Sequence, residues 1–174
     1  MKLKKYFFKR VKSTNDVALR LIKMGNQSGA ILTEYQSKGR GQRKNKWISY
    51  KGNLFMTVFF EISKKKSIKK IINYNTLIIK NVILEKIKSI INIKKPNDIL
   101  IDKKKVCGIL QETLFKNDKK FLVVGIGINI KNSPNLINYQ TTCLNNYSNK
   151  KINNLKLFNE IILNYEKNIS FFGS

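Results

Sequence analysis

The most constraining feature of the sequence is a pair of β-branched and aromatic runs on either side of a short polar turn. Residues Val106 to Phe115 and Phe121 to Ile130 flank the turn KNDKK, a pattern that predicts a long antiparallel hairpin. A third run, Leu54 to Ile62, is apolar at almost every position, which is typical of a buried strand. We therefore expect a sheet that contains these three strands.

Weaker patterns surround these runs. Apolar residues at helical spacing predict a helix over 67–88, an earlier helix between Ser13 and Gly25, and a last helix over 152–170. Ser13 is the expected N-cap of the earlier helix, with Asp16 completing a reciprocal capping pair. Strands and helices do not alternate regularly, so we expect an α+β fold with a mixed, largely antiparallel sheet and helices on one face. The shorter strands are predicted at Lys4 to Val11, 29 to 36, Ile90 to Lys94 and Ile99 to Ile101.

The length and composition favour one folded domain. The chain has 174 residues, is 42% hydrophobic and contains no Gly/Ser/Pro-rich linker, so a single core is the economical arrangement. No apolar run approaches the roughly 20 residues that span a bilayer, and the N-terminus does not have the pattern of a secretory signal. We expect a cytoplasmic protein without a membrane anchor.

The formal net charge of +25 has two readings. Only four of the 35 basic residues are arginines, and the lysines are scattered along the chain together with many isoleucines and asparagines. An AT-rich coding sequence would produce that combination without selection for an acidic partner. A basic nucleic-acid-binding module stays the alternative.

The chain contains no histidine and two cysteines that lie far apart, Cys107 and Cys143. The absence of histidine excludes Ser-His-Asp catalysis and histidine-ligated metals. The cysteines predict buried reduced thiols, and no side-chain motif predicts a metal site. Chemistry that relies on lysine, arginine, carboxylates and backbone groups suits phosphate and adenylate reactions.

Four short motifs carry groups suited to a small anionic ligand. KSTND (12–16) places two hydroxyls and an amide at a predicted helix start, where free N–H groups favour an anion or a polar ring. QSKGRGQRKNKW (36–47) adds an arginine fork for carboxylate or phosphate. KKPNDILIDKKKVCGIL (94–110) sets an amide and a carboxylate at a turn before a lysine, and VVGIGINI (123–130) marks a strand that something approaches closely. Alone, each motif is also an ordinary cap, loop, turn or strand.

In this order and together, the motifs resemble the biotin–protein ligases, also called biotin–[acetyl-CoA-carboxylase] ligases or holocarboxylase synthetases. The resemblance implies the fold shared by these ligases and the class II aminoacyl-tRNA synthetases. It covers residues 1–174 as a single catalytic domain, without the family's N-terminal DNA-binding domain or C-terminal β-barrel domain. The matching residues are Ser13-Thr14-Asn15, Glu34-Tyr35-Gln36, Gly39-Arg40-Gly41, Trp47, Gly52-Asn53-Leu54, Lys94, Pro96-Asn97-Asp98, Lys105-Val106-Cys107-Gly108-Ile109-Leu110 and Gly125-Ile126-Gly127-Ile128-Asn129.

The resemblance also implies an activity. Members of the family join biotin to ATP with Mg²⁺, form biotinyl-5′-AMP, and transfer biotin to one lysine of the biotin carboxyl carrier protein of acetyl-CoA carboxylase. We expect the same substrates and partner here, with no DNA and no membrane involved, and a homodimer is left open. A lipoate or octanoate ligase of the same fold is the alternative within this chemistry.

By the same resemblance, Lys105 would bridge the carboxyl oxygen of biotin and the α-phosphate, while Asp98 would orient or deprotonate the acceptor lysine. The implied catalytic residues are Lys105, Arg40, Lys94, Asp98 and Asn97. The implied biotin-binding residues are Ser13, Thr14, Asn15, Gln36, Gly39, Arg40, Gly108, Gly125 and Gly127. The implied adenylate-binding residues are Arg40, Gly41, Gln42, Trp47, Lys105 and Asn129.

The sequence departs from the family pattern at several positions. Gln42 and Asn45 stand where the family has arginines, Lys95 replaces the tryptophan of the family's KWPND run, and Tyr50 replaces a proline. Loss of a cation at residue 42 predicts a weaker hold on the anionic adenylate.

Overall fold

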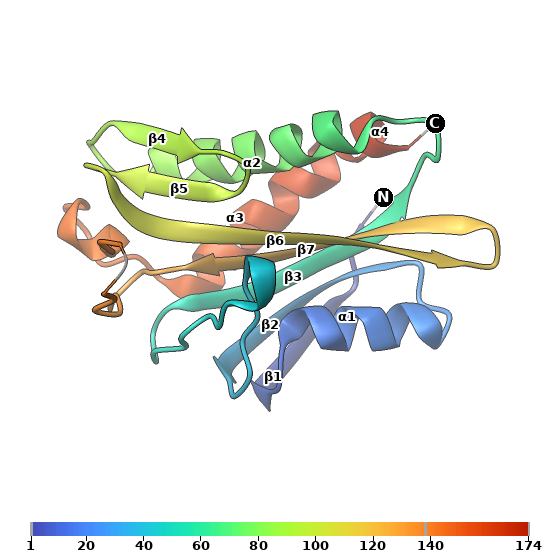
Figure 1. Cartoon of the computed structure of the whole chain (residues 1–174), viewed down its shortest axis with the longest axis horizontal. Coiled ribbons are helices and arrows are strands. Elements are labelled where there is room, and N and C mark those ends of the chain that lie inside the picture. Colours follow the sequence, from blue (N-terminus) through green and yellow to red (C-terminus); the bar gives the residue numbers. More distant parts are fainter. Residues whose placement is uncertain (1, 138, 174) are drawn as a thin grey trace.

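A seven-stranded sheet forms the centre of the computed structural model, which describes residues 2–137 and 139–173 (Figure 1). The strands run across the sheet in the order β1-β2-β3-β7-β6-β5-β4. In the described ranges β1 and β2 are the one parallel pair, and the other neighbours are antiparallel. The predicted mixed, largely antiparallel sheet is therefore confirmed. The strands are β1 Lys5–Val11, β2 Ser28–Gln36, β3 Leu54–Ile62, β4 Ile91–Lys94, β5 Asp98–Ile101, β6 Lys104–Lys116 and β7 Lys119–Ile128.

The three strong runs of the sequence form the middle of the sheet. Strands β6 and β7 are the predicted hairpin, and β7 pairs along its other edge with β3. The two turn residues, Asn117 and Asp118, have φ angles of 46° and 57°. Positive φ at both central positions defines the turn that suits the twist of a hairpin, and Asn and Asp adopt it more readily than most residues.

Helices cover both faces of the sheet (Figure 1). The helices are α1 Thr14–Lys23, α2 Ile68–Leu84, α3 Asn154–Lys167 and the short α4 Ile169–Phe172. On β3, Val58 and Phe60 belong to the large core formed with α2 and α3, whereas Phe59 packs in a separate cluster with α1. The prediction that the helices lie on one face is wrong for α1. Because β3 is apolar on both sides, each side needs a helix to cover it.

The start of α1 also differs from the prediction. Ser13 occupies the N-cap position, but its side chain makes no capping hydrogen bond, so the predicted capping pair with Asp16 is wrong. The Asp16 carboxylate instead lies 2.9 Å from the guanidinium of Arg40. A contact with a residue 24 positions away has displaced the local one.

Both cysteines are buried free thiols, as predicted. Burial raises the pKa of the Cys107 thiol far above its usual range, so this thiol is chemically quiet. None of the helices in the two described ranges is long and apolar enough to cross a membrane.

Candidate active site

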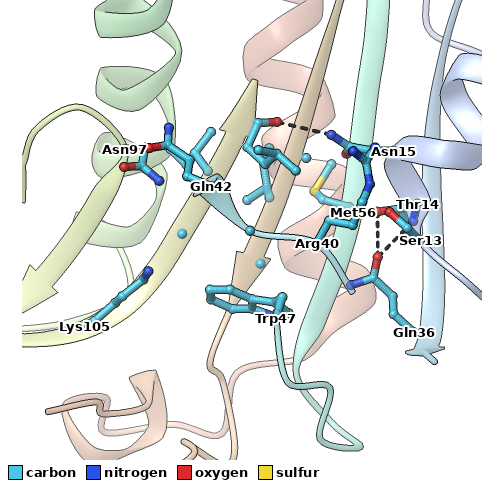
Figure 2. A pocket seen from close by; sticks show the side chains of 17 residues that line it. Ser13, Thr14, Asn15, Gln36, Arg40, Gln42, Trp47, Met56, Asn97 and Lys105 are labelled. Carbon is cyan, nitrogen blue, oxygen red and sulfur yellow. Dashed lines mark hydrogen bonds between the residues drawn. The ribbon is translucent and has the colours of Figure 1, made fainter. Parts of the chain in front are cut away.

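A cavity of about 50 Å³ lies between the start of α1, strands β6 and β7, and the loop from β2 to β3 (Figure 2). Among the residues that the structure describes, thirteen that the sequence predicts for the site line this cavity. These are Ser13, Thr14, Asn15, Gln36, Arg40, Gly41, Gln42, Trp47, Asn97, Lys105, Gly108, Gly125 and Gly127.

One end of the cavity is a buried polar cluster. The backbone N–H and the hydroxyl of Thr14 donate to Gln36 Oε1 at 2.9 Å and 3.1 Å. The Thr57 hydroxyl donates to Asn15 Oδ1 at 2.7 Å and also lies 2.8 Å from Thr14 Oγ1. These groups come from α1, β2 and β3, and all four side chains are at most 8% exposed. Buried polar groups that are held by each other present a fixed pattern of donors and acceptors.

The floor of the cavity consists of glycine backbone. A Cβ atom at Gly108 or Gly127 would overlap the indole of Trp47, and one at Gly125 would overlap the side chain of Asn15. Only glycine allows such close approach. In Figure 2 the indole lies between Lys105 on one side and the Gln36–Thr14 pair on the other.

The loop that carries Trp47 closes on itself and is anchored by one arginine. The backbone N–H of Trp47 donates to the Gly39 carbonyl at 2.9 Å, and the backbone N–H of Gly41 donates to the Asn45 carbonyl at 2.7 Å. Arg40 makes a fork of two hydrogen bonds to Glu112, at 2.9 Å and 2.8 Å, in addition to its contact with Asp16.

The charge of Arg40 is favoured at this position. Partial burial opposes the charge, but hydrogen bonds and attraction from Glu112 and Asp16 outweigh it, so that the pKa of Arg40 rises. Glu112 also accepts a hydrogen bond from Asn15 Nδ2 at 2.7 Å. The anchored loop is thereby connected to the polar end of the cavity.

The opposite end of the cavity holds the second cation. Lys105 Nζ lies 2.9 Å from Asp98 Oδ1, and the two side chains are 15% and 21% exposed. The ammonium group also lies 5.5 Å from the ring centre of Trp47 and 5.2 Å from that of Tyr139. A carboxylate and two aromatic rings therefore surround Lys105.

Four of the predicted site residues do not line this cavity. Asp98 forms an ion pair with Lys105, and Gly39 belongs to the loop itself, where a Cβ would overlap the Trp47 backbone carbonyl. Asn129 directly follows β7, donates to the Thr142 carbonyl at 3.1 Å and lines a smaller hollow with Trp47 and Lys105. Lys94 is exposed on β4 and lines neither hollow.

Sequence reasoning missed both apolar and polar members of the site. Met56, Ile109, Leu110 and Ile126 line the cavity without having been predicted for it. Glu112 and Thr57 were missed as the partners that fix Arg40, Thr14 and Asn15. The available signal for Thr57 was a hydroxyl inside an otherwise apolar run, because such a group needs a buried partner. Glu112 lies between Gln111 and Thr113, so nothing in its local pattern distinguished it.

The arrangement is suited to holding a small anionic molecule beside two cations. Ligand pockets usually measure about 300–1,000 Å³, so a ligand of ordinary size enters only if Trp47 moves away from the glycine floor. No group of three or more His, Cys, Asp or Glu side chains that could hold a metal ion occurs among the described residues. The carboxylates at the cavity are paired with Arg40 and Lys105 instead.

The chain belongs to the biotin/lipoate A/B protein ligase family, whose model matches residues 7–129. It is 30% identical over 146 residues to chloroplastic biotin–protein ligase 1 of Arabidopsis thaliana, covering 78% of this chain and 37% of that protein. It is 31% identical over 123 residues to the bifunctional ligase/repressor BirA of Escherichia coli, covering 69% and 38%.

The solved structures that this fold matches include biotin protein ligases. The biotin protein ligase of Leishmania major in complex with biotin superposes with a TM-score of 0.78 at 27% identity, over 92% of this chain and 71% of that one. The enzyme of Aquifex aeolicus in complex with biotin and ATP also gives 0.78 at 27% identity, over 96% and 70%. The resemblance seen in the sequence is confirmed. The chain spans less than half the length of the two curated relatives described above.

Proposed function

We propose that the protein is an ATP-dependent ligase that makes biotinyl-5′-AMP and transfers biotin to a lysine of a biotin carboxyl carrier protein. The observation that supports this proposal most directly is one cavity with a buried polar cluster at one end and Lys105, paired with Asp98, at the other. The solved relatives bound to biotin and ATP support the same assignment.

The polar end matches the ring system of biotin. A cyclic urea carries two N–H donors and one carbonyl acceptor, and the Thr14, Asn15 and Gln36 side chains offer both kinds of group from fixed positions. The valeryl chain would run over the glycine floor, where Ile109 and Ile126 supply apolar contact. The carboxylate of biotin would then face the cationic end.

The cationic end suits the first half-reaction. A carboxylate oxygen of biotin attacks the α-phosphate of ATP, a new P–O bond forms, and pyrophosphate leaves with the electron pair of the broken bond. Lys105 would neutralise charge that accumulates between the carboxyl and phosphate oxygens, and Arg40 would supply a second positive charge. Trp47 and Asn129 line the smaller hollow, where the nucleotide side of the adenylate would lie.

The second half-reaction needs a neutral amine. The acceptor lysine attacks the carbonyl of the adenylate, an amide bond forms and AMP leaves. Asp98 would take the proton of the amine or orient it; its ion pair with Lys105 at 2.9 Å and the position of Asn97 in the cavity wall support this role. Exposed Lys94 lies at the ladder position opposite Asp98 and does not line the cavity.

Mg²⁺ would enter with ATP. The ion usually takes most of its ligands from phosphate oxygens and water, with one or two carboxylates. The carboxylates beside the cavity, Glu112 and Asp98, are paired with Arg40 and Lys105 and form no dedicated cage, which fits an ion brought by the nucleotide. The free buried thiols suit a reducing compartment, and we place the reaction in the cytoplasm.

Thermal unfolding with ligands tests the assignment. Biotin and ATP–Mg²⁺ together should raise the unfolding temperature more than the sum of the two separate shifts, because the adenylate binds as one molecule. Stabilisation by lipoate or octanoate with ATP, and not by biotin, would identify the other branch of the family. Indifference to all of them, with salt-steep DNA or RNA binding, would support a nucleic-acid-binding module.

A further inference from the structure

We propose that Tyr139 is a positioning residue for Lys105, holding its ammonium group beside Asp98 through a cation–π contact. The proposal rests on the proposed function, in which Lys105 is the lysine at the reacting atoms. Tyr139 lies outside the four motifs that point to the site, and it is 43% exposed, so nothing in the sequence distinguishes it from a surface tyrosine.

Tyr139 contacts Lys105 from a segment separate from the loop, and it lines the smaller hollow together with Lys105 and Trp47. Lys105 Nζ lies 5.2 Å from the ring centre of Tyr139, within the roughly 6 Å over which an aromatic face attracts an ammonium ion. The Trp47 ring is at a similar distance, 5.5 Å, and Asp98 supplies the ion pair. The three contacts come from three separate segments of the chain.

Backbone hydrogen bonds hold the Tyr139 segment against β6. The Lys105 N–H donates to the Gln140 carbonyl at 2.9 Å, and the Thr142 N–H donates to the Lys105 carbonyl at 2.9 Å. Lys105 and Thr141 form a parallel bridge. The segment that follows Tyr139 is therefore hydrogen-bonded to the backbone of Lys105, the same residue whose side chain contacts the Tyr139 ring.

This arrangement differs from that of Trp47. Trp47 has to leave the glycine floor before a ligand of ordinary size can enter, and its contact with Lys105 moves with the loop. Tyr139 is not part of that loop. With Asp98 it keeps the long lysine side chain in place during the step in which the other ring is displaced, which reduces the rotamer freedom that the side chain would otherwise regain.

The test compares three forms of the intact chain: wild type, Tyr139→Leu and Tyr139→Phe. Biotin-dependent exchange of labelled pyrophosphate into ATP measures adenylate formation. We expect Tyr139→Leu to lower kcat about fivefold to tenfold, as expected for loss of a partly desolvated cation–π contact, with the KM for biotin within about twofold. Tyr139→Phe keeps the ring and should restore kcat to within about twofold of wild type.

Phe115→Leu is the matched control. It removes a ring that lies 5.6 Å from Lys120 Nζ at the end of the hairpin, away from the cavity, and should leave the exchange rate unchanged. A Tyr139→Leu variant as active as wild type would overturn the proposal. The same holds if Tyr139→Phe is as slow as Tyr139→Leu, or if only the KM changes, since the residue would then act through its hydroxyl or on substrate.

A second readout needs no turnover. The ε-methylene protons of Lys105 should show an upfield ring-current shift in the NMR spectrum, which shrinks in Tyr139→Leu and persists in Tyr139→Phe. An unchanged shift in Tyr139→Leu would refute the contact. If wild type showed no biotin-dependent exchange while the shift behaved as expected, the proposed function would fail and the contact would stand.

Discussion

Arg40 and Lys105 both bring a paired positive charge to the cavity, but different parts of the fold carry them. Arg40 belongs to the loop between β2 and β3, has a side chain that is 37% exposed, and reaches two carboxylates on other elements, Asp16 and Glu112. Lys105 belongs to β6, has a side chain that is 15% exposed, and pairs with Asp98 on the neighbouring strand.

This difference between Arg40 and Lys105 shows which half of the site is fixed. Lys105 and Asp98 are held by ladder hydrogen bonds of the sheet, whereas the position of Arg40 depends on side-chain contacts that the loop makes elsewhere. Since Trp47 on that loop fills the space over the glycine floor, the loop half must rearrange for a ligand and the sheet half need not.

The largest expected effect is that of Lys105→Ala. Loss of the sheet-borne cation should reduce kcat of biotin-dependent pyrophosphate exchange by about 100-fold or more, in the range found when a charge-stabilising group is removed from an active site. Direct biotin binding should change little. Lys104→Ala, at the exposed neighbouring position, is the control, and exchange by Lys105→Ala within threefold of wild type would contradict the account.

The next effect tests the contact between floor and loop. In Gly127→Ala the added methyl overlaps the Trp47 indole, and overpacking of this kind costs about 1–3 kcal/mol. We expect a shifted emission spectrum of Trp47, the only tryptophan in the chain, and biotin affinity reduced about tenfold or more. Gly173→Ala has open space around it and should behave as wild type. Normal emission and affinity in Gly127→Ala would show that the indole does not rest on the floor.

Gln42→Arg adds a cation to the loop half. Residue 42 lines the cavity, and a hydrogen bond to a charged group contributes about 1.5–3 kcal/mol, so the variant should release biotinyl-5′-AMP roughly tenfold more slowly. Dissociation is measured by displacing bound labelled biotinyl-5′-AMP with an excess of unlabelled adenylate. Lys44→Arg, which leaves the net charge of the loop unchanged, is the control. Slower release by wild type than by Gln42→Arg would refute the idea.

The smallest effect concerns the anchor of the loop. Arg40→Ala removes the fork to Glu112 and the contact with Asp16, so trypsin should cut the 43–46 segment a few times faster, because opening frees this backbone more often. Mass spectrometry of the first cleavage products measures the rate, and Lys38→Ala is the control. An unchanged cleavage rate would mean that other contacts hold the loop.

The sequence predicted the fold well where patterns are local. Strand β3 has the predicted bounds, Leu54–Ile62, because an unbroken apolar run leaves few alternatives. The predicted helix over 67–88 became Ile68–Leu84, which is a difference at the ends. The prediction that α1 lies on the same face of the sheet as the other helices was wrong. The face that a helix covers depends on how β1 and β2 pair and not on the helix itself.

The site was less predictable for a physical reason. The motifs identified the cavity-lining residues by type and order, but the partners that hold them are distant in sequence. Glu112 contacts Arg40 across 72 residues, and Thr57 contacts Asn15 across 42. Ser13 and Asp16 looked like a local cap because nothing in the sequence shows that Arg40 will reach Asp16. Only the folded sheet brings these pairs together.

The most direct test of the central claim is biotin-dependent exchange of labelled pyrophosphate into ATP by the purified wild-type chain. We expect exchange that requires biotin and Mg²⁺, does not require a carrier protein, and falls by about 100-fold or more in Lys105→Ala. Absence of exchange at saturating biotin and ATP, or exchange that proceeds equally well without biotin, would contradict it.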